Sequence, residues 1–148
     1  MVLVQHIFEA ARRRLAVLRR DASVSAAAAV LVNPNTTLAV VCDGDGVTVG
    51  VVSRTDIVKV IARAGTAAVN TDTGALMTSP VVYCHLAQPL ERVWATMNVR
   101  SIRCVPILDD CGRPQGVVHA RDLARALLDE VTEEEVLLRD YFLGVGYQ

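Results

Sequence analysis

The chain has 148 residues, of which 52% are hydrophobic, and a formal net charge of −1 at pH 7. So apolar and nearly neutral a chain is not expected to be disordered, and its charge gives no reason to expect a nucleic-acid partner. Its longest apolar run, residues 26–32, is far shorter than the roughly 20 residues that a membrane-spanning helix needs. These properties predict a globular, non-membrane protein of one domain, or of two very small halves that share a core.

The N-terminal segment is expected to be a short amphipathic lead-in. Its basic residues, Arg12, Arg13 and Arg14, follow the apolar residues, whereas a secretory signal carries its basic residues first. The four cysteines lack the paired spacing of a zinc site, and three of them lie in apolar, strand-like runs where a free thiol behaves as a small hydrophobe. We therefore expect no metal site and a protein of the reducing cytoplasm.

The sequence contains an internal repeat. When the chain is shifted by 66 residues, its two halves align over nearly fifty residues without an insertion. The matching pairs include Val24 with Leu90, Val41 with Ile107, Asp43 with Asp109, Gly46 with Gly112, Gly50 with Gly116 and Asp56 with Asp122. A single offset that holds for so long indicates two copies of one structural unit.

In chain order, each copy is expected to form a short extended piece, a helix, two strands joined by a turn, and a closing helix. Helical spacing of apolar residues, β-branched runs and the Asp/Gly turns "DGDG" and "DDCGRP" support these assignments. The expected elements of the first copy are 15–18, 24–32, 36–41, 47–52 and a helix from Thr55, and those of the second are 81–84, 90–99, 102–108, 115–118 and a helix from Arg121. The predicted fold is α/β (α+β), with two βαββα units in tandem.

Two further segments complete the predicted organisation. Residues 64–77 are polar and turn-prone, so we expect them to connect the copies. After the second copy, Thr132 and Glu135 match a capping box, which predicts a separate terminal helix lying on the pair or on a neighbouring subunit. The predicted boundaries are 1–66 for the first unit with its lead-in, 67–130 for the second unit, and 131–148 for the C-terminal helix and tail.

Each copy closes with a similar corner, "GVVSRTD" at 50–56 and "GVVHARD" at 116–122. Ser53 and Asp56 are expected at the carboxyl end of a strand, where ligands commonly bind in α/β folds. An ionised Asp accepts hydrogen bonds on two oxygens, which suits the neighbouring hydroxyls of a ribose, while the Ser hydroxyl and the first amides of the helix suit a phosphate. The alternative is that these side chains only cap the helix.

The two corners, together with "CVPILDDCGRPQGVV" and "LMTSPVVYC", resemble the motifs of CBS domains. The tandem is similar to a CBS pair, also called a Bateman module, over about residues 10–130, and the tail "LRDYFLG" resembles that of small stand-alone bacterial CBS-pair proteins. The resemblance implies two units related by a pseudo-twofold axis. It also implies two clefts that bind adenosine-containing ligands, namely AMP, ADP, ATP, NAD(H) or S-adenosylmethionine.

The resemblance assigns candidate nucleotide-binding residues to both clefts. The first cleft would use Ser53 and Asp56 at the ribose, Arg103 at a phosphate, and Thr78, Val81, Val82 and Pro106 around the base. The second would use Asp122, with Ala16, Val17 and Leu38 around the base, and carries His119 and Arg121 in its corner. For Arg103, an alternative role as a solvated residue stays open.

The chain departs from the family pattern in both corners. His119 stands where the family has Ser or Thr, so the second corner loses its phosphate contact, or gains a pH-sensitive one if the histidine becomes cationic near its usual pKa of about 6.5. An empty second cleft is an equal alternative. In the first corner Thr55 stands where Arg is common, and Arg54 is expected to point elsewhere. The first cleft is therefore the better candidate.

The sequence shows no nucleophile–base pair, P-loop or HExxH motif, so we expect no catalytic residues and no enzyme activity. The hypothesis is a regulatory, energy-sensing module that requires no cofactor and binds an adenine nucleotide (AMP, ATP or NAD) as regulatory ligand. The alternative is a protein–protein interaction scaffold with vestigial pockets. The resemblance also implies a homodimer, for which Val93 and Trp94 are either interface or core residues, and a regulated protein that the sequence does not identify.

Overall fold

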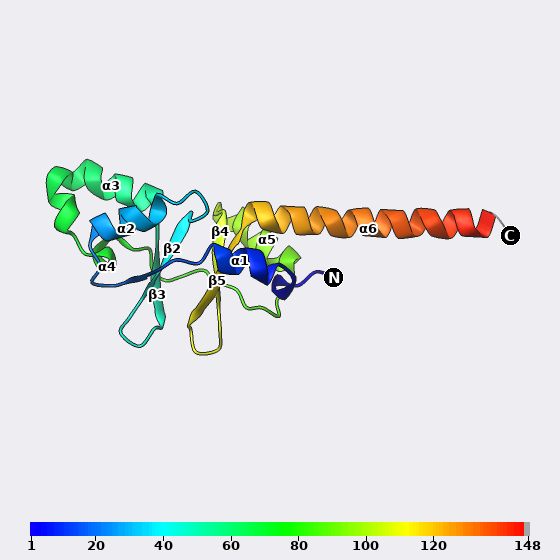
Figure 1. Ribbon diagram of the computed structural model, residues 1–148, viewed down its shortest axis with the longest axis horizontal. Helices are drawn as coiled ribbons and strands as arrows, with labels where there is room; N and C mark the ends of the chain where they lie inside the picture. The colour runs from blue at the N-terminus through cyan, green and yellow to red at the C-terminus, as the bar shows by residue number, and fades with distance from the viewer. Residues whose placement is uncertain (147–148) are drawn as a thin grey trace.

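The repeat in the sequence folds into two similar units that lie side by side, and one long helix leaves the second unit (Figure 1). The structure, a computed structural model, describes residues 1–146, with side chains as far as residue 143, so residues 147 and 148 of the predicted tail lie outside it. The elements are the 3₁₀ helix η1 (Val4–Ile7), α1 (Phe8–Arg13), β1 (Val17–Arg19), α2 (Val24–Leu31), β2 (Leu38–Cys42), β3 (Thr48–Ser53), α3 (Arg54–Ala64), the 3₁₀ helix η2 (Gly65–Asn70), α4 (Thr73–Leu76), α5 (Leu90–Arg100), β4 (Cys104–Leu108), β5 (Pro114–His119) and α6 (Ala120–Gly146).

The strands of the two β-hairpins are paired in equivalent registers. Strands β2 and β3 pair antiparallel, as do β4 and β5, and each residue pair in the first ladder has its counterpart 66 residues later in the second. Both ladders shift register at the same step, after Val41 and after Ile107. The predicted repeat and the mixed α/β fold are therefore confirmed.

Equivalent turns close the two hairpins. The Oδ1 atom of Asp43 accepts hydrogen bonds from two backbone amides of the first turn, and Oδ1 of Asp109 does the same in the second. Gly46 and Gly112 follow with φ of 81° and 79°, a conformation that L side chains rarely adopt. The turns predicted from "DGDG" and "DDCGRP" are confirmed.

The extended piece of the second unit is not a strand. In the first unit β1 pairs parallel with β2, but in the second unit Cys84 makes only an isolated parallel bridge with Ile107. The backbone before it is paired elsewhere, because Thr78 exchanges two hydrogen bonds of 2.8 and 3.1 Å with Val51 in the first unit. Of the extended piece predicted at 81–84, only the bridge of Cys84 is therefore present. The chain from Thr78 to Cys84 passes from the sheet of the first unit to that of the second.

The helices differ from prediction in three ways. The closing helices α3 and α6 begin one residue earlier than predicted, at Arg54 and Ala120, and the connection 64–77 contains two short helices, η2 and α4. The predicted capping box at Thr132 is wrong, because α6 runs through that position without a break. No Gly or Pro interrupts 120–143, so nothing in the chain stops the helix there.

The segment that precedes each unit packs against the other unit. Val4 and Ala11 of the lead-in belong to the core of the second unit, whereas Ala68 of the connection belongs to the core of the first. A third cluster joins Val40 and Cys42 of the first unit to Val117 of the second. The two units are therefore tied together through their cores. No helix within residues 1–146 is long and apolar enough to cross a membrane.

Candidate functional site

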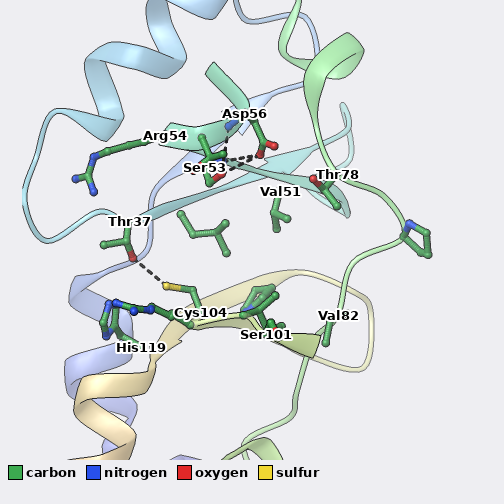
Figure 2. Close-up of a pocket in the computed structure, with 16 residues that line it drawn as sticks. Thr37, Val51, Ser53, Arg54, Asp56, Thr78, Val82, Ser101, Cys104 and His119 are labelled. Carbon is green, nitrogen blue, oxygen red and sulfur yellow. Dashed lines mark hydrogen bonds between the residues drawn. The ribbon is translucent and has the colours of Figure 1, made fainter. Parts of the chain in front are cut away.

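A cavity of about 530 Å³ lies between the two units (Figure 2). Figure 2 shows Ser53, Asp56 and Thr78 on one side of it and Ser101, Cys104 and His119 on the other. Its complete lining is Thr37, Leu38, Val51, Ser53, Arg54, Thr55, Asp56, Thr78, Pro80, Val82, Ser101, Ile102, Arg103, Cys104, Pro106 and His119. Both units contribute to the lining, so a ligand held here would contact both.

The first corner forms a helix cap at the edge of the cavity. Ser53 is the N-cap residue of α3, and its hydroxyl accepts a hydrogen bond of 3.4 Å from the amide of Asp56. In return, Oδ2 of Asp56 accepts hydrogen bonds from the amide and the hydroxyl of Ser53, at 2.8 and 3.1 Å. The capping interpretation is thus correct for Oδ2. Oδ1 of Asp56 accepts no hydrogen bond from residues 1–143 and stays available to a ligand.

The two arginines of the lining have different environments. Arg54 is held by three hydrogen bonds: its Nε donates to the carbonyl oxygen of Leu31 at 2.8 Å, and its Nη2 donates to those of Asn33 and Thr36 at 3.1 and 3.2 Å. Arg54 nevertheless lines the cavity, so the expectation that it points away from a ligand stays a prediction. The guanidinium of Arg103, by contrast, forms no hydrogen bond or ion pair with any of residues 1–143. Arg103 is therefore the cation that can meet an anionic ligand group.

Two further polar residues, Cys104 and His119, lie on the same side of the cavity as Arg103. The thiol of Cys104 and the hydroxyl of Thr37 share a hydrogen bond of 3.0 Å, and burial raises the pKa of this thiol. Burial is also the largest cause that lowers the pKa of His119, with Arg14 adding to the effect and Asp122 opposing it. His119 is therefore neutral at neutral pH, and the idea that it becomes cationic near pH 6.5 is not supported.

The cavity gathers most, but not all, of the predicted site residues. Of those assigned to the first cleft, Ser53, Asp56, Thr78, Val82, Arg103 and Pro106 line it and Val81 does not. Of those assigned to the second cleft, Leu38 and His119 line this same cavity, whereas Ala16, Val17, Arg121 and Asp122 do not. Val17 is 49% exposed, and Asp122 is ion-paired with Arg14.

Several lining residues were not predicted from the sequence. Thr37, Val51, Pro80, Ser101, Ile102 and Cys104 were not predicted to contact a ligand. Ser101 ends helix α5 in a left-handed conformation, with φ of 55°, which no residue-type rule anticipates for Ser. Thr37 and Val51 could have been found from the strand register, since both neighbour predicted site residues. Within residues 1–146, no cluster of three or more His, Cys, Asp or Glu side chains could hold a metal ion.

Comparison with known proteins gives a consistent result. The model of the CBS domain matches residues 4–63 and 74–129. The CBS-domain containing protein ATU1752 from Agrobacterium tumefaciens superimposes with a TM-score of 0.74 and 27% identity, over 84% of this chain and 98% of that one. The curated L-aspartate semialdehyde sulfurtransferase of Methanocaldococcus jannaschii is 31% identical over 104 residues, but this chain spans only 19% of its length.

Two similar structures were solved with adenosine compounds. The CBS domain pair of protein MJ0100, in complex with 5′-methylthioadenosine and S-adenosyl-L-methionine, gives a TM-score of 0.75 at 25% identity, over 88% of this chain and 98% of that one. CBSX2 in complex with AMP gives a TM-score of 0.74 at 25% identity, over 87% of this chain and 98% of that one.

Proposed function

This chain belongs to the CBS domain family as a tandem CBS pair, and from that premise we propose that it is a regulatory module that binds an adenosine nucleotide between its two units. The observation that carries the proposal is the cavity of about 530 Å³, with an available carboxylate oxygen at one edge and an available guanidinium at another. Sites for small molecules typically measure about 300–1,000 Å³. The complexes of MJ0100 and CBSX2 with adenosine compounds support the same ligand class.

Asp56 is the proposed anchor for the ribose. Its Oδ2 atom is held by Ser53, which fixes the orientation of the carboxylate, and Oδ1 is left to accept a hydrogen bond from a ribose hydroxyl. A hydrogen bond to a charged group contributes roughly 1.5–3 kcal/mol. The helix cap and the ribose contact are therefore compatible roles of one side chain.

Arg103 is the proposed contact for the phosphate. A guanidinium matches a phosphate through paired N–H donors. The fixed guanidinium of Arg54 adds positive charge near the cavity, while Asp56 is the one carboxylate of the lining. This balance favours a phosphate-bearing nucleotide over S-adenosylmethionine, whose sulfonium is cationic. The apolar side chains of Val51, Val82 and Pro106 are the proposed surroundings of the adenine.

Binding is the proposed means of action, without catalysis. Cys104 is the one cysteine of the lining, but its raised pKa leaves little thiolate, and its thiol is hydrogen-bonded to Thr37. A ligand that contacts both units biases their arrangement by its difference in affinity for the alternative arrangements. Regulation of a partner protein would follow from that shift.

The experiment is a calorimetric titration with AMP, ADP, ATP, NAD⁺, S-adenosylmethionine and 2′- and 3′-deoxy-AMP. We expect wild type to bind AMP, and Asp56→Asn to weaken binding at least about tenfold, the loss of one charged hydrogen bond. The deoxy ligand that lacks the contacted hydroxyl should bind wild type weakly but lose nothing further in Asp56→Asn, which separates ribose contact from helix capping. Recovery of the nucleotide unchanged checks that no reaction occurs.

Arg103→Ala tests the phosphate contact through a comparison of AMP with adenosine. This variant should lose affinity for AMP but not for adenosine, because the nucleoside has no phosphate. Arg100→Ala, an exposed residue at the end of α5 that does not line the cavity, is the matched control. Wild-type protein that binds none of these ligands would overturn the proposed function.

A second role, self-association, is favoured by the arm of α6, which we define as residues 131–143. Every residue of the arm is exposed, including large apolar ones such as Leu138 at 60% and Phe142 at 70%. The spacing of Val131, Leu138 and Phe142 places them on one side of the helix, in line with Leu127, which packs on the core of the second unit. The apolar stripe of α6 that packs on the second unit thus continues along the exposed arm.

We infer that a second copy of the chain covers this stripe with its helix α3. Glu134 and Glu135 flank the stripe, and α3 presents the exposed apolar Val58 and Ile61 beside the exposed Lys59 and Arg63. The acidic residues beside the apolar stripe of the arm would therefore face the basic residues beside the apolar residues of α3. An arm cannot reach α3 of its own chain, because the two lie at opposite ends of the molecule (Figure 1). The core contains Val93, and Trp94 is 37% exposed, so of the two earlier interface candidates only Trp94 remains.

Light scattering after size exclusion tests the dimer. Leu138→Lys should yield monomer, whereas Val136→Lys, on another side of the same helix, should stay dimeric. Charge reversal of Lys59 and Arg63 to Glu should also yield monomer, and Glu134→Lys with Glu135→Lys in the same chain should restore the dimer. A monomeric wild type would overturn self-association, and a charge-reversed protein that stays dimeric would overturn the contact with α3.

A further inference from the structure

The second corner is occupied by the chain itself. Asp122 is the counterpart of Asp56 in the repeat, but both of its carboxylate oxygens are engaged. Nε of Arg14 donates to Oδ2 of Asp122 at 2.7 Å, and Nη2 of Arg14 donates to Oδ1 at 3.3 Å. The two side chains are only 15% and 18% exposed. A ribose hydroxyl would therefore have to compete at both oxygens of Asp122 with a two-point ion pair that is already formed within the chain.

Arg14 is held in this place by its surroundings. It follows helix α1, whose Ala11 lies so close to Gly116 that a Cβ there would sit 2.9 Å from the Ala11 carbonyl carbon. Nη1 of Arg14 also donates to the carbonyl of Asn35 at 3.3 Å. The guanidinium thus connects the second corner to the loop before β2. Its position is a built feature of the packing of α1 on β5.

The first corner lacks such an arginine. The offset of 66 residues that relates Asp122 to Asp56 also relates Arg14 to Pro80, which lines the cavity and carries no charge. The same offset relates Ala11 to Met77, the residues that face the equivalent glycines Gly116 and Gly50. The two corners therefore have equivalent strand registers, but the arginine that pairs with the aspartate of the second corner has an uncharged proline as its counterpart in the first unit.

His119 of the second corner also forms a hydrogen bond within the chain. Nδ1 of His119 accepts a hydrogen bond of 3.0 Å from the amide of Arg121, so the residue that replaces Ser53 serves the start of α6. In the first corner the Ser53 hydroxyl instead exchanges hydrogen bonds with Asp56. The groups that would bind a nucleoside in the second corner are thus satisfied within the chain.

We propose that Arg14 acts as an internal substitute for a ligand at the second corner, so that each chain binds one adenosine nucleotide instead of two. The inference rests on the proposed function of the cavity between the units. It makes Arg14 the residue that sets the number of sites, because removal of its guanidinium frees both oxygens of Asp122 for the hydroxyls of a ribose.

The test is the stoichiometry of AMP binding by calorimetry. Wild type is expected to bind one equivalent, and Arg14→Met is expected to bind a second. Arg12→Met is the matched control, because Arg12 lies in α1 but is exposed and pairs with Glu9. It should retain one equivalent. Circular dichroism should show that all the variants are folded.

A second variant separates this inference from the proposed function. Asp56→Asn with Arg14→Met weakens the first site and should leave one high-affinity equivalent, bound at the second corner. Adding Asp122→Asn should abolish that binding. If wild type binds two equivalents of AMP, or if wild type and Arg14→Met both bind one, the inference is overturned while the proposed function stands. No binding by wild type or Asp56→Asn, with one equivalent in Arg14→Met, would overturn only the function proposed for the first site.

Discussion

His119 stands where the first unit has Ser53, and the exchange changes the chemistry of its surroundings. A serine hydroxyl is neutral at every working pH, whereas an imidazole titrates near 6.5 unless its environment shifts it. Burial and the nearby cations Arg14, Arg121 and Arg103 lower the pKa of His119, and Asp122 opposes them. The protonated form is thus disfavoured in the folded chain, so His119 links folding to pH.

The stability of the protein should fall in acid through His119. Below pH 6.5 the unfolded chain takes up a proton at this residue before the folded chain does, so the free energy of unfolding decreases as pH falls towards the folded-state pKa. His119→Gln lacks this contribution. Urea unfolding at pH 7, 6 and 5 should show a larger loss of stability in wild type than in the variant. An equal loss in both would contradict the argument, since His6 and His85 are common to the two proteins.

Strand β5 and helix α1 meet more closely than most packed elements, because Gly116 has no side chain. A Cβ at Gly116 would lie 2.9 Å from the carbonyl carbon and 3.0 Å from the carbonyl oxygen of Ala11. At the equivalent Gly50, a Cβ would lie 2.7 Å from Cγ of Met77. Backbone atoms of a helix cannot move aside as a flexible methionine side chain can. Both positions therefore leave no room for a Cβ atom, but the neighbour of Gly50 can move aside more easily than the neighbour of Gly116.

Gly116→Ala should be more destabilising than Gly50→Ala. Overpacking typically costs about 1–3 kcal/mol, and we expect Gly116→Ala to fall in or above that range and Gly50→Ala at or below its lower end. Gly44→Ala, where no atom lies within 4 Å of the new Cβ, is the control and should change stability little. Urea unfolding midpoints of the three variants give the comparison. The reverse order of the two midpoints would contradict this account of the α1–β5 contact.

The elements that could be predicted from sequence are those specified by local residues. The Asp/Gly turns, the hairpins and the helix cap at Ser53 each depend on residues a few positions apart. The ion pair between Arg14 and Asp122 joins residues 108 positions apart, and the hydrogen bond between Thr37 and Cys104 joins residues 67 apart. Such contacts follow from how the units pack. For the same reason the sequence did not predict that Leu38 and His119 line the same cavity as Ser53 and Asp56, or that Thr78 pairs with Val51.

Neither unit completes its core from its own repeat alone. The lead-in packs into the second unit, the connection packs into the first, and Val40, Cys42 and Val117 form a cluster across the boundary. A unit of about 60 residues buries only about 60% of its unfolded surface and is marginal alone. The exchange of segments compensates for this small size, since each unit completes its core with residues that lie elsewhere in the chain.

The whole chain should therefore unfold in one transition, and probes in the two units should report the same midpoint. Trp94, the single tryptophan, lies in the second unit, and Cys42, 4% exposed, lies in the first. In a variant that keeps Cys42 as its one cysteine, tryptophan fluorescence and thiol reactivity can be followed in the same urea series. Coincident curves are the mark of a two-state transition. Two separate midpoints would mean that the units fold independently and that the shared cluster contributes little to stability.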